Sequence, residues 1–300
     1  MKEKFIKNKQ GLTEEEEFLK QYNSTIYEKP SLTVDMLIFT VMEEEKENYR
    51  KLAEKSLKIL LVKRGNHPDM GKWALPGGFV LTDESLDDAA LRVLRKETNI
   101  ENIYMEQLYT WGEVNRDPRT RVISSSYMAL VDSSSLSIKA GNNEEDARWF
   151  NIEYNLLSEN SLDIESGESF EEIVEIKLWN NSEEISAKIR VIENIDGRIR
   201  REIIESVGLA FDHGKFIEYG ISRLRNKVEY TSLAFNLMPE LFTLTELQKV
   251  YEIIQGKELL AAAFRRKISN MVVETNEFTK DVGHRPSKLF RYNPRWKRIK

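Results

Sequence analysis

A glycine-rich turn that leads into an acidic helix is the part of the sequence best suited to phosphate chemistry. The segment, residues 71–100, reads GKWALPGGFVLTDESLDDAALRVLRKETNI. A divalent cation bound to a pyrophosphate needs several carboxylates on one surface, and helix positions three or four apart share a face. The pattern predicts a helix from about Ser85 to Thr98, with Asp83 or Ser85 as its N-cap.

This segment resembles the Nudix box, in which a glycine, five residues, a glutamate and seven residues precede Arg-Glu-aliphatic-any-Glu-Glu-any-Gly-aliphatic. The matching residues are Gly78, Glu84, Arg92, Leu94, Glu97 and Ile100. The three glutamates that face the metal in this family fall here on Val93, Lys96 and Glu97, and the late glycine falls on Asn99.

The altered helix face carries a valine, a lysine and one glutamate where the Nudix box carries three negative charges. An ammonium beside a dication is repelled and Val93 offers no oxygen ligand, so we expect no catalytic residue and no required cofactor. Glu84, Arg92 and Glu97 are then remnants of the box, and Lys96 becomes a candidate to neutralise a phosphate directly.

The alternative is a metal-dependent Nudix hydrolase, an ADP-ribose or nucleoside-diphosphate pyrophosphatase with an accessory domain. Mg²⁺ would then be held by Glu84 and Glu97.

Arginines and aromatics elsewhere in the sequence are candidates for ligand contacts. The stretch LYTWGEVNRDPRTRVISSSYMALV (108–131) and the later DARWF resemble the Nudix branch that handles ADP-ribose, where an Arg-Asp-Pro-Arg loop lies beside the ligand. The candidates for phosphate contact are Arg64, Arg116 and Arg119, because a guanidinium matches phosphate oxygens. Trp73 and Phe79 are the candidates for stacking on adenine or resting on the sugar. The alternative is that these aromatics pack and these arginines are solvated.

The C-terminal third predicts two helices joined by a short turn. Thr243 or Thr245 caps the first helix and Gly256 ends it, and its inward positions are Leu247, Val250, Tyr251 and Ile254. The second helix extends from about Glu258 to Asn270. Its predicted buried stripe is Leu260, Phe264, Ile268 and Met271, and its outward positions are Ala262, Arg265, Arg266 and Ser269. This arrangement is typical of a helix-turn-helix that enters the major groove of DNA.

A hairpin after these helices predicts a wing, with MVVE paired to KLFRY around the loop TNEFTKDVGHRPS. The tail from Arg285 to Lys300 holds seven Lys and Arg and no acid, and residues 211–300 hold 17 Lys and Arg against 10 Asp and Glu, although the whole chain is formally −5. Such a basic region favours contact with phosphate backbones. The DNA-binding candidates are Thr243, Thr245, Arg265, Arg266, Lys267, Arg285, Lys288 and Arg291. A helical dimerisation domain with a solvated basic tail is the alternative.

Strands and helices must position the candidate ligand-binding and DNA-binding residues. The sequence predicts a polar helix near Thr13–Gln21 and a charged hairpin excursion or short helix over residues 42–56. Alternating or apolar runs predict strands at 32–41, 58–64, 107–114, 121–131, 146–152, 170–180, 185–193 and 198–205, whereas residues 155–168 are polar and linker-like. Strands mixed with one long central helix predict an α+β fold.

Three segments follow from this pattern: an N-terminal helical segment over 1–30, a Nudix-like ligand-sensing domain over 31–207 with a β extension at about 160–205, and a winged helix DNA-binding domain over 208–300. The last segment, with RLRNKVEYTSLAF, FTLTELQKVYE and FRRKI, resembles the winged-helix half of the Nudix-related transcriptional regulators called NrtR. The resemblance implies a Nudix αβα sandwich with a mixed sheet, followed by a winged helix-turn-helix. The β extension has no counterpart in it, and either enlarges the sensor or contributes to a dimer.

The same resemblance implies a regulator of NAD-metabolism operons with ADP-ribose as effector, although relatives of this architecture sense pentose sugars. We expect a homodimer on a near-palindromic operator in double-stranded DNA, because a single helix-turn-helix reads too few bases. A Nudix-fold interaction protein that does not bind DNA is a further alternative. The sequence has no cysteine, which excludes disulfides and thiol chemistry. It has no signal peptide and no apolar run of membrane-spanning length, so we expect a cytoplasmic protein without membrane contact.

Overall fold

The computed structural model describes residues 13–43, 55–99, 103–135, 147–164, 167–279 and 286–296. The strands are β1 (Ser31–Glu43), β2 (Lys55–Lys63), β3 (Trp73–Ala74), β4 (Gly77–Phe79), β5 (Tyr104–Trp111), β6 (Val122–Val131), β7 (Ala147–Ile164), β8 (Gly167–Trp179), β9 (Glu184–Asn194), β10 (Ile199–Val207), β11 (Val272–Phe278) and β12 (Lys288–Tyr292). Ten of them form one sheet in the order β10-β9-β8-β7-β2-β1-β6-β5, with β3 added to β2 and β4 to β1. Strands β1 and β6 run parallel while β1 and β2 run antiparallel, so the sheet is mixed, as predicted.

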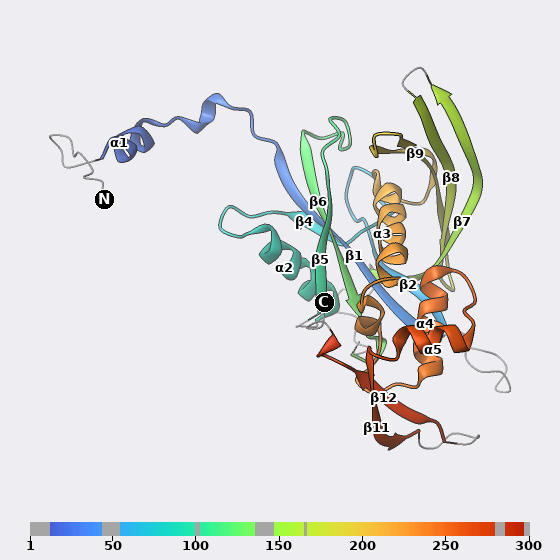
Figure 1. Ribbon diagram of the computed structural model, residues 1–300. Helices are drawn as coiled ribbons and strands as arrows, with labels where there is room; N and C mark the ends of the chain where they lie inside the picture. Colours follow the sequence, from blue (N-terminus) through green and yellow to red (C-terminus); the bar gives the residue numbers. More distant parts are fainter. Residues whose placement is uncertain are drawn as a thin grey trace.

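Helices lie on both faces of this sheet, which confirms the predicted α+β class (Figure 1). The helices are α1 (Glu14–Gln21), α2 (Leu86–Thr98), α3 (His213–Val228), α4 (Leu244–Gln255) and α5 (Ala261–Ile268), with 3₁₀ turns η1 (Ser24–Ile26), η2 (Ser133–Ser135) and η3 (Leu233–Leu237). Helix α2 packs against one face and α3 against the other. Over the described ranges, every helix is too short or too polar to cross a membrane.

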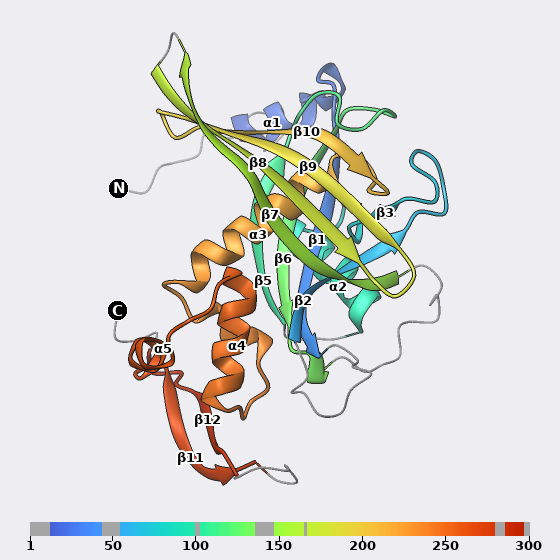
Figure 2. The same cartoon turned by 90° about the vertical axis from the view of Figure 1, so that its right-hand side faces the viewer.

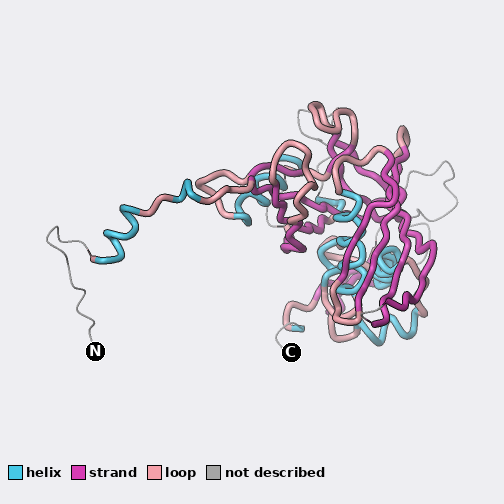
Figure 3. Tube along the Cα trace, turned by 90° about the horizontal axis from the view of Figure 1, so that it is seen from above, coloured by secondary structure: helices cyan, strands magenta, loops and turns pink. Residues whose placement is uncertain are grey.

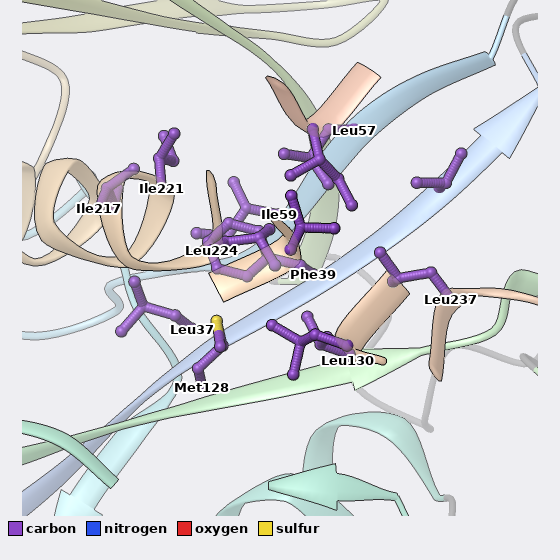
Figure 4. Packing of buried hydrophobic residues seen from close by; sticks show 14 of the residues in the cluster. Leu37, Phe39, Leu57, Ile59, Met128, Leu130, Ile217, Ile221, Leu224 and Leu237 are labelled. Carbon is purple, nitrogen blue, oxygen red and sulfur yellow. The ribbon is translucent and has the colours of Figure 1, made fainter. Parts of the chain in front are cut away.

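The central strand β1 contributes to both layers because its side chains alternate between the two faces. Val34 and Ile38 pack with α2, whereas Leu37 and Phe39 point to the opposite face. Figure 4 shows the latter two beside Leu224 of α3. None of these five side chains is exposed, so the sheet is dry on both sides at its centre.

Helix α3 approaches the sheet closely at one point. A Cβ atom at Gly220 would collide with the Leu37 side chain, so glycine is needed at this contact. Figure 2 shows that α3 lies along the sheet and ends beside α4, with which it is in contact. A single helix therefore touches both the sheet and the C-terminal helices.

The β extension continues the same sheet, and its three predicted strands are confirmed as β8, β9 and β10. The linker expected over residues 155–168 is wrong, because β7 continues to Ile164, which pairs with Gly167 of β8. This hairpin reaches beyond the packed core, and Leu156 and Leu157 are half exposed. A strand with solvent on both faces has no apolar alternation, which is why its composition resembles that of a linker.

The N-terminal segment extends away from the sheet (Figure 3). Thr13 and Glu16 form a capping box at the start of α1, which confirms the predicted helix. Of the charged stretch 42–56, Met42 pairs with Ser56 between β1 and β2, and residues 44–54 lie outside the described residues.

The C-terminal helices and hairpin form a winged helix, as predicted. Strands β11 and β12 pair antiparallel, and Phe242 just before α4 forms a β-bridge with Phe290 of β12. The buried core of this unit is continuous with that of the sheet, since one apolar cluster contains Leu130 of β6, Leu237 of η3 and Tyr251 of α4. Figure 4 shows Leu237 on the same side of β1 as Leu130.

Candidate functional site

The turn and helix that resemble the Nudix box form as the sequence predicts. Ser85 is the N-cap of α2, and its hydroxyl accepts a hydrogen bond from the amide of Asp88 in a capping box. Asn99 stands where the box has its late glycine and ends the helix with φ 53°, a left-handed conformation that asparagine adopts more easily than most residues. Ile100 lies outside the described residues.

Glu84 ties the turn to the helix. Its carboxylate accepts a hydrogen bond of 2.9 Å from Arg92 Nε and another of 2.9 Å from the amide of Leu81. The hydrogen bonds from Arg92 are the main reason that the pKa of Glu84 falls to about 2. Arg92 also donates to the carbonyl oxygen of Phe79 at 3.0 Å. Both carboxylate oxygens of Glu84 are therefore engaged within the protein.

The three positions that carry metal-facing glutamates in the Nudix box hold a single carboxylate here, that of Glu97. Val93 is 3% exposed and packs in the core between α2 and the sheet. Lys96 is largely exposed, with its ammonium 3.1 Å from a carboxylate oxygen of Glu97. Over the described ranges, no group of three His, Asp or Glu side chains lies close enough together to hold a metal ion. These donors do not fit a divalent cation.

A cavity of about 320 Å³ lies beside the box, between the sheet, the loop after β5 and the start of α3. It brings together four of the six predicted ligand contacts, Arg64, Phe79, Arg116 and Arg119. Its other lining residues include Asp35, Asp117, Phe211 and His213. Sequence reasoning missed Phe211 and His213 because they follow β10, far along the chain from the box.

Two arginines share one aromatic ring in this cavity. The guanidinium carbons of Arg64 and Arg119 lie 4.5 and 5.8 Å from the ring centre of Phe211, and that of Arg119 lies 5.7 Å from the ring centre of Phe79. Burial, followed by the charge of Arg119, lowers the pKa of Arg64. Because two cations crowd the same wall, an anion placed between them would relieve their repulsion.

Asp117 neutralises part of this charge. Arg119 Nη2 lies 2.7 Å from a carboxylate oxygen of Asp117, and the hydrogen bonding lowers the pKa of that carboxyl. The Arg119 side chain is still 43% exposed, so one side of its guanidinium is accessible from the cavity.

Arg116 lines the cavity but is already paired. Its Nη2 and Nε donate to the two carboxylate oxygens of Asp212 at 2.8 and 3.1 Å, and the two side chains are 5% and 8% exposed. This bidentate pair joins the loop after β5 to the residue that precedes α3. Arg116 thus holds the start of α3 in place while lining the cavity, where the sequence predicted it as a candidate for phosphate contact.

Phe211 is held in an uncommon backbone conformation. Its φ is 50°, in the left-handed region that large side chains rarely occupy. The amide of Phe211 donates a hydrogen bond of 2.9 Å to the carboxylate of Asp69, which is itself left-handed with φ 59°. The loop after β2 therefore fixes the aromatic ring that the two arginines cover.

His213 forms the floor of the cavity at the first turn of α3. Its Nδ1 accepts a hydrogen bond of 2.9 Å from the amide of Leu75, and its Nε2 lies 3.8 Å from a carboxylate oxygen of Asp35. Burial is the main reason that the pKa of His213 is lowered, so the ring is neutral at physiological pH. Asp35 in turn accepts a hydrogen bond from Ser124.

Two predicted ligand residues lie elsewhere. Trp73 is 1% exposed, its ring packs edge-on against Phe150, and its indole donates to Glu183, so no face is open for stacking. For Trp73 the structure therefore agrees with the alternative, in which the aromatic packs in the core. Lys96 projects from α2 into solvent and does not line the cavity.

The helix-turn-helix confirms most of the second predicted pattern. Thr243 is the N-cap of α4 in a capping box with Glu246, so its hydroxyl is used within the protein, whereas Thr245 is exposed. The inward residues of α4 are buried as expected, and Gly256 ends the helix with φ 67°. Helix α5 is shorter than predicted, because the chain before Ala261 belongs to the turn.

Side chains of α4 hold this turn. Gln248 Nε2 donates to the carbonyl oxygen of Leu259 at 2.8 Å, and a carboxylate oxygen of Glu252 accepts from the amide of Leu259 at 3.1 Å. Leu259 packs partly against the core, but Leu260 is 82% exposed. The expectation that Leu260 belongs to the buried stripe is therefore wrong, because Leu260 is the N-cap of α5 and precedes the helical spacing.

Helix α5 buries Phe264 and Ile268 and presents the opposite face to solvent. That face carries Ala262, Arg265, Arg266 and Ser269, all exposed as predicted. Neither arginine has an acidic partner in the part of the chain that the structure describes.

Two other DNA-binding candidates, Lys267 and Lys288, contact other side chains of the protein. The ammonium of Lys267 lies 5.3 Å from the ring centre of Tyr251, and burial lowers its pKa. Lys288 forms an ion pair with Glu274 within the wing. Arg291 is exposed on β12, and Arg285 lies outside the described residues.

Helix α3 connects the cavity with the winged helix. His213 at its first turn lines the cavity, and Arg225 near its last turn donates to the carbonyl oxygen of Ile254 of α4 at 3.1 Å. The guanidinium of Arg225 also lies 4.3 Å from the ring centre of Tyr154 on β7. Arg225 therefore bridges the sheet and the C-terminal end of α4, where the helix dipole favours a cation.

Comparisons with known proteins agree with this division. Residues 52–171 match the model of the NUDIX domain, and residues 234–292 match that of the NrtR DNA-binding winged helix domain. The chain is 33% identical over 285 residues to the ADPR responsive transcriptional repressor NtrR of Acinetobacter baylyi, with 94% of this chain and 90% of that protein covered.

Two solved structures are similar over nearly the whole chain. The structure of Shewanella oneidensis NrtR complexed with a 27mer DNA has a TM-score of 0.60 and 28% identity, with 88% of this chain and 94% of that chain covered. A MutT/nudix family protein from Enterococcus faecalis has a TM-score of 0.65 and 27% identity, with 92% of each chain covered.

Proposed function

This chain belongs to the NrtR family of Nudix-related transcriptional regulators, and from that membership we propose that it is a DNA-binding repressor whose Nudix domain binds ADP-ribose without hydrolysing it. The observation that carries the proposal is the position of α3, which lines the cavity at its first turn and contacts α4 near its last. A ligand that fits the cavity can thereby bias the placement of the winged helix.

The cavity favours a phosphorylated ligand over a neutral sugar. Arg64 and Arg119 present guanidinium groups on one wall, and such groups pair well with phosphate oxygens. Phe79 and Phe211 offer aromatic surface beside them for an adenine or a ribose. A pentose offers no anion to either guanidinium, so ADP-ribose is the better match.

The proposal that the ligand is not hydrolysed rests on the donor set. Glu84 is engaged by Arg92, Val93 has no oxygen, and Lys96 places a positive charge beside Glu97. An assay with ADP-ribose and Mg²⁺ or Mn²⁺ should therefore give no turnover. A rate on the order of 1 s⁻¹, ordinary for an enzyme, would show instead that this is a Nudix hydrolase.

We further propose that the repressor acts as a homodimer on a near-palindromic operator. One α5 helix spans only a few base pairs of a major groove, and a twofold axis places two such helices on successive half-sites. The ligand would then act by favouring one relative placement of the two winged helices, which requires different affinities for the two placements.

Calorimetric titration and a gel shift test the proposal together. Titration of ADP-ribose into the full-length protein should show binding, and Arg64→Ala combined with Arg119→Ala should weaken it strongly. Lys96→Ala is the matched control, since Lys96 is an exposed cation outside the cavity. The gel shift uses duplexes that the protein selects from a random-sequence pool, and added ADP-ribose should change their affinity. A protein that binds neither ADP-ribose nor any duplex at low salt would disprove the proposed function.

A further inference from the structure

An apolar surface lies at the tip of the helix-turn-helix, among basic residues. Leu260 is 82% exposed, the largest exposed fraction among the described large hydrophobic side chains. It is followed by three exposed alanines, Ala261, Ala262 and Ala263. Leu260 and the alanines leave apolar area in water, and contact with another surface would remove that area from water.

The exposure of Leu260 is built into the turn. The backbone amide and carbonyl of the preceding Leu259 are both hydrogen-bonded by α4 side chains, Glu252 and Gln248. Leu259 then packs inward and Leu260 points away from the core. The carbonyl oxygen of Leu260 accepts the first helical hydrogen bond from Phe264 at 2.9 Å, which fixes it from the other side. The side chain is thus displayed by a rigid frame.

The exposed face of α5 continues from this apolar surface. Ala262, Arg266 and Ser269 follow one another at intervals of four and three, on the face opposite the buried Phe264 and Ile268. The exposed guanidinium of Arg266 sits one turn beyond Ala262. A polyanion that meets this arginine therefore also meets the alkyl groups of the first turn.

Base pairs display one apolar group in the major groove, the 5-methyl group of thymine. We propose that Leu260 and Ala262 recognise thymine through this methyl group, so that each operator half-site carries thymine where the turn enters the groove. This inference rests on the proposed DNA-binding function. Side chains at these two positions have no hydrogen-bonding atoms, so they discriminate by apolar contact, while Arg265 and Arg266 supply attraction to phosphates or guanine.

The charge around the turn favours DNA over a second copy of this chain as the covering partner. Arg265 and Arg266 flank the apolar surface and have no acidic partner among the residues described. The winged helix matches a DNA-binding family model over residues 234–292. A second copy would bring an identical basic surface against this one, which is repulsive.

The test removes single methyl groups from the DNA. The full-length protein selects duplexes from a random-sequence pool, and each thymine of one half-site is then replaced by deoxyuridine, which lacks only the 5-methyl group. Loss of one buried methyl should weaken binding about fourfold. The variant Leu260→Ala should weaken binding to the thymine duplex by a similar factor, and should bind the sensitive deoxyuridine duplex no worse than the unaltered protein does.

Leu156→Ala is the matched control, since Leu156 is a half-exposed leucine on β7 outside the winged helix, and it should not affect either duplex. Ala262→Ser is a second variant that retains the helix and should reduce the discrimination between thymine and deoxyuridine.

Two results would overturn the inference while leaving DNA binding intact. One is that the selected half-sites contain no thymine, and the other is that no replacement of thymine by deoxyuridine changes the affinity. A Leu260→Ala defect that is equal on both duplexes would also overturn it. Failure of the unaltered protein to bind any duplex would instead remove the proposed function.

Discussion

The cavity and the exposed face of α5 use the same residue type in opposite ways. In the cavity, Arg116 is bound by Asp212 with both side chains almost fully buried, and Arg119 is bound by Asp117. On α5, Arg265 and Arg266 are exposed and have no acidic partner within the described ranges. A fully buried pair such as Arg116 and Asp212 fixes the geometry of a pocket, a half-exposed arginine such as Arg119 can still meet a ligand, and the exposed arginines of α5 remain available for phosphates. The position of the acids thus distinguishes the sensing region from the DNA-binding region.

The largest effect is expected when the buried pair is broken. Arg116→Ala leaves the Asp212 carboxylate buried without a partner, which should lower the free energy of unfolding by about 3–5 kcal/mol. Urea unfolding followed by circular dichroism measures the change. Arg198→Ala is the control, because the Arg198 and Asp196 side chains are 82% and 43% exposed and the loss of their ion pair should cost much less. Equal losses for the two variants would contradict the distinction between a buried and an exposed pair.

The unpaired arginines should matter for binding and not for folding. Arg265→Ala combined with Arg266→Ala should weaken DNA binding by about 100-fold and make it less dependent on salt. Fluorescence anisotropy with the selected duplex measures both. ADP-ribose affinity should not change. Arg198→Ala removes an exposed cation from the turn between β9 and β10 and serves as control. Binding that survives the double substitution would show that α5 is not the recognition helix.

A pH-dependent effect is expected from His213. The folded protein holds this ring neutral with a pKa below the ordinary 6.5, whereas the unfolded chain can protonate it. The unfolded state therefore binds more protons below pH 6.5, and stability falls as the pH falls through that range, by at most about 1.4 kcal/mol per pH unit. His213→Asn keeps an acceptor for the Leu75 amide and removes the titration. Its stability should decline less between pH 7.5 and 5.5 in urea unfolding, and parallel declines would refute the assignment.

The smallest effect concerns the contact between the two regions. Arg225→Gln removes the charge that bridges Tyr154 and the carbonyl of Ile254. ADP-ribose affinity and DNA affinity should each stay within about twofold, while the change that ADP-ribose makes in DNA affinity should shrink by about fivefold. Measuring DNA affinity with and without saturating ADP-ribose gives this coupling. Arg223→Gln, an exposed neighbour on α3, is the control. An unchanged coupling would show that Arg225 only supports packing.

Local patterns could be predicted from the sequence, because neighbouring residues determine them. The capped helix after the glycine turn, the inward residues of α4 and the exposed arginines of α5 all follow from helical spacing and capping. The family resemblance added the order of the domains, which the matches to both family models support.

The errors arise where distant segments meet. Phe211 and His213 enter the cavity only because the chain after β10 returns to β3, where the amide of Trp73 donates to the carbonyl of Gly208. The same return helps to bury Trp73, which the sequence had offered as a stacking candidate. The exposed Leu260 depends on hydrogen bonds from α4 that no helical period encodes.

The apolar core that passes from Leu130 through Leu237 to Tyr251 constrains how a signal can move. A winged helix attached by a loose tether could swing through a wide arc, but here such a swing would open the core to water and cost the burial energy of several large side chains. The available movement is shear, in which packed helices slide by a small distance while their side chains stay interlocked. Because α3 lines the cavity at its first turn and contacts α4 near its last, a small shift of α3 would move the winged helix with it.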